Sequence, residues 1–167
     1  MTLKIKTALI LGCLLLGASA LVAGSSAIRP SQAHEDHLHV TFSAGEPGNP
    51  RARSRAITVK MRSQGKKMLF EPARIEVRRN EQIRFVLENE DDEHHEFMLA
   101  TVEENQKHAE AMKKFPDMEH DDPNGRKITA YSSGEIFWKF TKPGEFEYAC
   151  LIPGHYEAGM VGKVIVK

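Results

Sequence analysis

The chain has 167 residues, of which 41% are hydrophobic and 28% are charged, with 23 basic and 23 acidic side chains. The zero formal charge and the aromatic content of 7% exclude a nucleic-acid-binding protein that relies on bulk positive charge. The hydrophobic fraction is that of a globular domain and argues against wholesale disorder.

The first 33 residues have the pattern of an export signal. Lys4 and Lys6 give a short positive segment, and an apolar run from Ala8 to Val22 follows. We predict a signal peptide over residues 1–33, cleaved after Ala33, with Ala20 as the alternative cleavage point. Its removal leaves 134 residues with 20 basic and 23 acidic side chains, a formal charge of −3 and enough chain for one domain.

Two other interpretations of this N-terminal run are open. It could be an uncleaved membrane anchor, but Gly12 and Gly17 interrupt it and it is short for a span of ~20 residues. Leu11-Gly12-Cys13 is a weak lipid-attachment motif, and the apolar run continues well past Cys13. We therefore expect no stable membrane insertion after cleavage and a periplasmic protein.

Cysteine usage then becomes informative. The sequence contains Cys13 and Cys150 only, and Cys13 leaves with the predicted signal. A single thiol exported to an oxidising compartment, where cysteines normally pair, is a liability unless something holds it. Cys150 is therefore a candidate metal ligand.

Residues 34–55 are polar, rich in glycine and proline, and show little periodicity. We interpret them as a flexible N-terminal arm that includes the basic group Arg51, Arg53 and Arg55. The arm also carries His34, His37 and His39, whose spacing suits an accessory copper-capturing peptide, although exported termini are often merely polar.

From residue 56 to residue 167 the hydrophobic pattern predicts strands. Apolar residues alternate with polar ones in several short runs separated by glycine, proline and asparagine clusters, which is typical of an antiparallel sandwich or barrel. The expected inward-facing residues include Ile83, Phe85 and Leu87; His95, Phe97 and Leu99; Ile136, Trp138 and Phe140; Phe146, Tyr148 and Cys150; and Val164 and Val166. This alternation predicts an all-β domain.

One helix is expected between the strands. Thr101 and Glu104 have the spacing of a capping box, and Ala109, Met112 and Phe115 then recur at helical spacing until Pro116. The segment after Pro116 shows no regular pattern.

Three metal-binding side chains follow the last but one predicted strand. Cys150, His155 and Met160 lie within eleven residues, and soft sulfur ligands with imidazole suit copper. A second histidine completes the ligand set of an electron-transfer copper site. Strand parity favours His95 over its neighbour His94, because His95 shares a face with apolar residues. Zinc is the alternative metal, but methionine is a poor zinc ligand.

With these residues, the span from Ala56 to Lys167 resembles the cupredoxins, the copper-binding fold of plastocyanin and azurin. The Cys150-x4-His155 spacing is similar to azurin, and His155-x4-Met160 is similar to plastocyanin. The runs from Phe115 to Asn124 and from Cys150 to Met160 resemble periplasmic copper-tolerance cupredoxins of Gram-negative bacteria. In plastocyanin and azurin an asparagine usually follows the first histidine ligand, whereas Glu96 stands here.

The resemblance implies a Greek-key β-sandwich that holds one type 1 copper ion through His95, Cys150, His155 and Met160. It also implies one-electron redox activity in periplasmic copper tolerance. We expect a monomer without catalytic residues that binds copper and no nucleic acid. One alternative is an electron carrier between periplasmic redox enzymes. A Cu(I)-oxidising enzyme is less favoured, because a single type 1 centre lacks the additional coppers for reducing dioxygen to water.

Two further groups of residues are open to more than one interpretation. Met118 and His120 could form another copper site, or their loop could serve as a structured lid. The acidic run from Glu90 to Glu93 is interpreted as a solvated turn that could also attract a cationic partner or Cu⁺.

Overall fold

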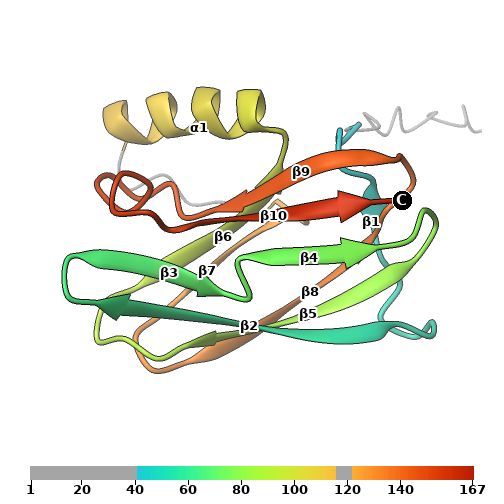
Figure 1. Cartoon of the computed structure of the whole chain (residues 1–167), viewed down its shortest axis with the longest axis horizontal. Helices are drawn as coiled ribbons and strands as arrows, with labels where there is room; N and C mark the ends of the chain where they lie inside the picture. The colour runs from blue at the N-terminus through green and yellow to red at the C-terminus, as the bar shows by residue number, and fades with distance from the viewer. Residues whose placement is uncertain (1–40, 116–121) are drawn as a thin grey trace, which may run out of the picture. The chain divides into compact units, whose positions relative to one another are not determined.

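Two five-stranded sheets pack face to face in the computed structural model, which describes residues 41–115 and 122–167 (Figure 1). One sheet has the order β1-β8-β5-β2-β3 and the other the order β4-β10-β9-β6-β7. The strands are Glu46–Pro47 (β1), Arg55–Gln64 (β2), Lys67–Glu71 (β3), Arg74–Val77 (β4), Gln82–Asn89 (β5), His95–Ala100 (β6), Gly125–Ile128 (β7), Ser133–Lys139 (β8), Gly144–Ala149 (β9) and Val161–Val166 (β10). Helix α1 (Val102–Lys114) lies between β6 and β7 in the chain, which confirms the predicted β-sandwich with one inserted helix.

The strand pairing is mixed rather than purely antiparallel. Strand β2 pairs in parallel with β5, and β4 pairs in parallel with β10, while the other neighbours are antiparallel as expected. A tight hairpin can join only antiparallel neighbours. In each parallel pair, the chain leaves the first strand, crosses to the opposite sheet and returns before it forms the second strand. Local alternation does not reveal such a connection.

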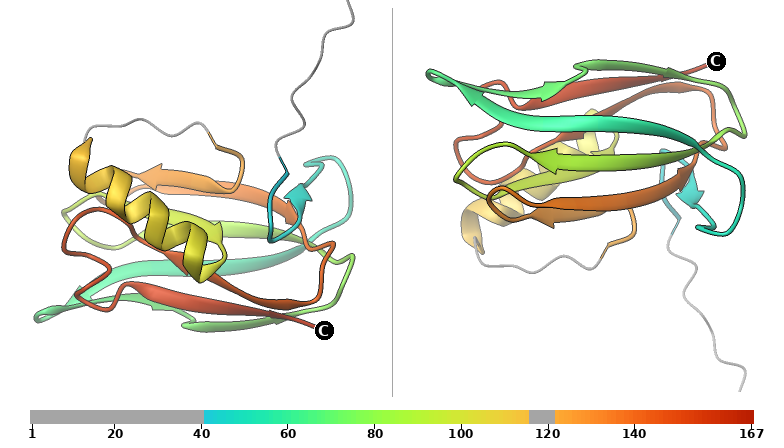
Figure 2. Two further views of the ribbon diagram at one scale, coloured as in Figure 1. Left: turned by 90° about the horizontal axis from the view of Figure 1, so that it is seen from above. Right: turned by 90° about the horizontal axis from the view of Figure 1, so that it is seen from below.

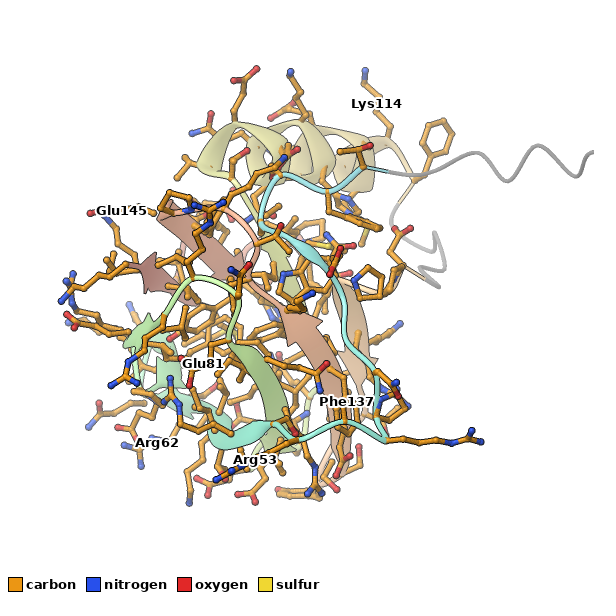
Figure 3. The ribbon with its side chains drawn as sticks, turned by 90° about the vertical axis from the view of Figure 1, so that its right-hand side faces the viewer. Arg53, Arg62, Glu81, Lys114, Phe137 and Glu145 are labelled. Carbon is orange, nitrogen blue, oxygen red and sulfur yellow. The ribbon has the colours of Figure 1, made fainter. Side chains whose placement is uncertain are left out.

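Residues from both sheets fill the space between them. On β5 the side chains of Ile83, Phe85 and Leu87 are fully buried, as their alternation predicts. The rings of Phe97 and Tyr148 stack with their centroids 5.3 Å apart. In the end view of Figure 3, charged side chains such as Lys114 and Arg53 lie at the periphery of the sandwich.

Gly162 makes room for the buried ring of Tyr148. The two residues are paired across β10 and β9, and a Cβ at position 162 would lie 2.2 Å from the Cζ atom of Tyr148. Because Tyr148 is fully buried and its hydroxyl donates to the carbonyl of Pro72, the ring cannot move away freely.

We therefore expect Gly162→Ala to lower the free energy of unfolding by ~1–3 kcal/mol, the usual cost of overpacking. Urea denaturation measures this effect. Lys163→Ala is the matched control on the same strand, since that side chain is exposed and its ion pair with Glu145 contributes little. Equal stability of the two variants would contradict the expectation.

Helix α1 covers the outer face of the sheet that contains β6 and β9 (Figure 2). The predicted capping box is present, because the side chain of Thr101 accepts from the Glu104 amide and the Glu104 carboxylate accepts from the Thr101 amide. Met112 packs with Met98 in a second small core beneath the helix, whereas Phe115 at the helix end is exposed. All six residues of β6 are buried, including those that alternation placed on the outer face, and the helix contributes by covering Met98.

Part of the predicted N-terminal arm packs on the sandwich. The Phe42 ring contacts Trp138 edge to face at 5.3 Å, and the indole Nε1 of Trp138 donates to the carbonyl of Ala44. Ala44 is buried, and the Gly48 amide donates to the carbonyl of Phe137. The segment from Phe42 to Gly48 is therefore attached to β8, although its composition is that of a linker.

Several sequence predictions concern residues outside the two described ranges. They are the signal peptide, the histidines His34, His37 and His39 of the arm, and the pair Met118 and His120. Within residues 41–115 and 122–167, no helix combines the length and apolar character needed to cross a bilayer.

Candidate metal centre

The candidate ligands meet at one end of the sheet formed by β4, β10, β9, β6 and β7. His95 is the first residue of β6, and Cys150 follows the last residue of β9. These two strands are antiparallel neighbours, so the start of one lies beside the end of the other. His155 and Met160 come from the loop between β9 and β10, which lies below α1 at the left-hand end of Figure 1.

Two imidazoles and one thiol converge there, close enough to one another to contact a single ion. The Nδ1 atoms of His95 and His155 are 3.2 Å apart, and Cys150 Sγ is 3.4 Å from His155 Nδ1. The three potential ligand atoms all lie within 4.8 Å of one another. Met160 is fully buried in the same core cluster as Cys150.

Backbone hydrogen bonds tie the loop residues to one another. The Cys150 amide donates to the carbonyl of Met160 at 3.1 Å, and the Met160 amide donates to the carbonyl of His155 at 3.0 Å. A further bond from the His155 amide to the carbonyl of Ile152 closes a turn. The spacing of Cys150, His155 and Met160 is thus fixed by the backbone.

The thiol of Cys150 lies in an apolar environment. It is fully buried, and burial raises its pKa to about 12 despite backbone N–H groups that favour the thiolate. One of these donors is the Glu96 amide, 3.3 Å from Sγ, so a backbone hydrogen bond reaches the sulfur although glutamate stands in place of asparagine. A cation at this position is what would hold the sulfur as thiolate.

The two histidines differ in their surroundings. His95 is fully buried, whereas His155 is 9% exposed and its Nε2 lies 3.7 Å from a Glu93 carboxylate oxygen. Burial and the neighbouring His95 lower the pKa of His155, although Glu93 opposes this shift. A neutral imidazole has the free lone pair that a metal ligand requires.

The structure distinguishes between the adjacent histidines 94 and 95. His94 is exposed at the surface, while His95 points into the sandwich as strand parity predicts. Of the four predicted ligands, the described residues bring His95, Cys150 and His155 together directly, with Met160 joined to them through the backbone.

The acidic run beside the site is not uniformly solvated. Asp91 is largely buried, and its Oδ2 lies 2.7 Å from His95 Nε2, whereas Asp92 is exposed as predicted. Burial raises the pKa of Asp91, but hydrogen bonds from Ser63 and His95 outweigh burial, so the pKa lies below its ordinary value. This contact was not predicted, and the spacing of four residues between Asp91 and His95 is the only local signal for it.

Helix α1 also supports the ligand loop. The buried carboxylate of Glu147 accepts hydrogen bonds from the side-chain Nδ2 of Asn105 at 3.1 Å and from the Tyr156 hydroxyl at 3.3 Å. Asn105 belongs to the helix and Tyr156 follows His155 in the loop. A groove of about 380 Å³ lies between the helix and this loop.

The donor set and its burial suit copper. Two imidazole nitrogens with one thiolate and a thioether are the ligands of electron-transfer copper sites, in which the thioether is a weak axial ligand. Donors of this kind that meet in a packed, largely dry core change position little when the charge of a bound ion changes.

Comparisons with known proteins agree with this geometry. Residues 57–167 match the family described as copper binding proteins of the plastocyanin/azurin family. The chain is 50% identical over 123 residues to the copper-resistant cuproprotein CopI of Rubrivivax gelatinosus, which covers 74% of this chain and 73% of that protein. It is 33% identical over 182 residues to the CopI of Pseudomonas aeruginosa, an alignment that covers 92% of this chain and 97% of that protein. Among solved structures, auracyanin B shares the fold with a TM-score of 0.61 and 21% identity over 74% of this chain and 96% of that one.

Proposed function

The chain belongs to the plastocyanin/azurin family of copper-binding proteins, and from that premise we propose that it holds one type 1 copper ion through His95, Cys150, His155 and Met160. We further propose that it serves copper tolerance in the periplasm as a binding protein with one-electron redox activity. It has no catalytic residues in this proposal.

One observation carries the ligand assignment. The Nδ1 atoms of His95 and His155 are 3.2 Å apart and Cys150 Sγ is 3.4 Å from His155 Nδ1, and one ligand atom from each of the three residues lies within 4.8 Å of the others. Little rearrangement is therefore needed for a single ion to contact all three. The fully buried Met160 supplies the soft fourth ligand, which favours copper over zinc.

The protein's own residues would determine how such an ion behaves. Copper supplies one-electron cycling between Cu(I) and Cu(II). The β-sandwich fixes His95, the hydrogen-bonded loop fixes Cys150 and His155, and the Glu96 amide donates to the sulfur. The apolar residues Leu151 and Ile152 limit water beside the thiolate. Of the four proposed ligands His155 is the most exposed, at 9%, so electrons would enter through it.

The relatives support a role in copper tolerance. Two proteins named copper-resistant cuproprotein align with most of this chain, at 50% and 33% identity. An export signal, if cleaved as the sequence predicts, would deliver the protein to the periplasm, where a tight copper site removes free ions. A dedicated electron carrier remains the second candidate, because its copper site would have the same ligands.

Deletion of the gene in its own organism separates these two functions. We expect the deletion strain to stop growing at a lower copper concentration than the parent, with unchanged tolerance to zinc. A plasmid with the wild-type gene should restore growth, and one with Cys150→Ser should not. Normal copper tolerance together with a respiratory defect would contradict the proposal and favour the electron carrier.

A further inference from the structure

A carboxylate lies directly behind the buried histidine of the proposed copper site. Asp91 Oδ2 is 2.7 Å from His95 Nε2, whereas the other ring nitrogen, Nδ1, lies near His155. The side chain of His95 is fully buried and that of Asp91 is 13% exposed, so little solvent screens the pair.

The position of Asp91 is fixed by contacts that do not involve the site itself. Its carboxylate accepts hydrogen bonds from the Ser63 amide at 2.9 Å and the Ser63 hydroxyl at 2.8 Å. Its own amide donates to the side chain of Asn89, and its carbonyl accepts from the Tyr131 amide. The carboxylate is therefore held in place before any ion binds.

This contact selects the tautomer of His95. An ionised carboxylate can only accept hydrogen bonds, so the proton of the ring lies on Nε2. The lone pair is then on Nδ1, the atom that lies 3.2 Å from His155 Nδ1. A carboxylate in this position also makes a histidine ligand more basic.

Within residues 41–115 and 122–167, the carboxylate paired with the second histidine is a weaker partner. Glu93 Oε2 lies 3.7 Å from His155 Nε2, and the Glu93 side chain is 59% exposed, so water screens its charge. The two histidines of the site are thus electrostatically unequal, and the buried one carries the stronger anionic partner.

We infer that Asp91 is a positioning residue that sets the reduction potential of the copper site by orienting His95 and making it a more electron-rich ligand. The negative charge stabilises Cu(II) more than Cu(I) and so lowers the potential. This inference rests on the proposed function, because it requires His95 to be a copper ligand.

Asp91→Asn removes the negative charge and keeps the shape of the side chain, with one oxygen left to accept from either His95 Nε2 or the Ser63 amide. We expect the preference for Cu(II) over Cu(I) to fall about tenfold, which corresponds to a rise of about 59 mV for one electron. The sulfur-to-copper absorption band should persist. Asp92→Asn is the matched control, since it removes the same charge from the adjacent, exposed position. Spectroelectrochemical titration of the copper-loaded proteins measures both potentials.

Ser63→Ala distinguishes charge from loop rigidity. It removes one hydrogen bond to Asp91 but leaves the carboxylate, so we expect its potential to stay near that of the wild type. Similar shifts in Ser63→Ala and Asp91→Asn would show a merely structural role and overturn the inference. An unchanged potential in Asp91→Asn would overturn it as well.

A measurement on the metal-free protein provides a second readout. Nitrogen-15 NMR of the His95 ring should show the proton on Nε2 in the wild type and a mixture of tautomers in Asp91→Ala. A mixture already present in the wild type would contradict the inference. If the wild-type protein formed no sulfur-to-copper band, the proposed function itself would fail, which is a different result from a normal band with an unchanged potential.

Discussion

Replacing Cys150 by serine is expected to abolish the intense sulfur-to-copper absorption band and with it the high-affinity copper site. The hydroxyl of serine is nearly the same size as the thiol but stays protonated and cannot supply the thiolate that gives the band. The fold should survive, because the Glu96 amide can donate to the hydroxyl oxygen as it does to the sulfur.

Titration of the purified protein with Cu(II), followed by visible absorption, measures this effect. In the wild type, the intensity of the band should stop rising at one copper per chain. Circular dichroism of the metal-free variant checks its fold. Met160→Leu provides the contrast, since it removes only the weak fourth ligand and should keep a band. A Cys150→Ser protein that retained the band would refute the thiolate site.

Replacing His95 by alanine is expected to weaken Cu(II) binding more than about 100-fold. Losing a residue that only hydrogen-bonds to a metal ligand costs about 10–100-fold, and losing the ligand itself should cost more. The neighbouring substitution His94→Ala should have almost no effect. The two residues have the same chemistry and are adjacent in the sequence, yet one is fully buried and the other is exposed. The pair therefore tests the assignment of the ligand rather than the general presence of histidine.

A competition titration against a chelator of known affinity measures both variants. Because His95→Ala also removes the partner of Asp91, the melting temperature of the metal-free protein should be recorded alongside it. Equal copper affinities for the two variants would show that His95 is not a ligand.

Local patterns predicted the parts of the fold that depend on local rules. Alternation identified the buried faces of β5 and β8, because side chains on a strand point to opposite faces in turn. The capping box predicted the start of α1, since that motif is complete within four residues. Cys150, His155 and Met160 indicated copper by their donor chemistry, and the pattern could be recognised because the three residues lie within one loop.

Contacts between distant segments could not be predicted in this way. The attachment of the segment Phe42–Gly48 to β8 joins residues about ninety positions apart, and its linker-like composition gave no sign of it. The burial of Glu96 depends on cover from outside the strand, which alternation within β6 does not report. Asp91 belonged to an acidic run, and its inward position depends on contacts that include Ser63, 28 positions earlier.

The loop from Cys150 to Met160 has a consequence for how such sites diversify. Its ends are joined by the pairing of Ala149 with Val161, and its interior closes on itself through backbone hydrogen bonds. Three of the four proposed ligands therefore belong to one self-contained loop, a ligand cassette, and the rest of the sandwich contributes only His95. Insertions or deletions inside the cassette can change ligand spacing without shifting the register of either sheet. An azurin-like first interval and a plastocyanin-like second one can accordingly coexist in a single loop, and grafting the segment between related scaffolds should transfer the site as a unit.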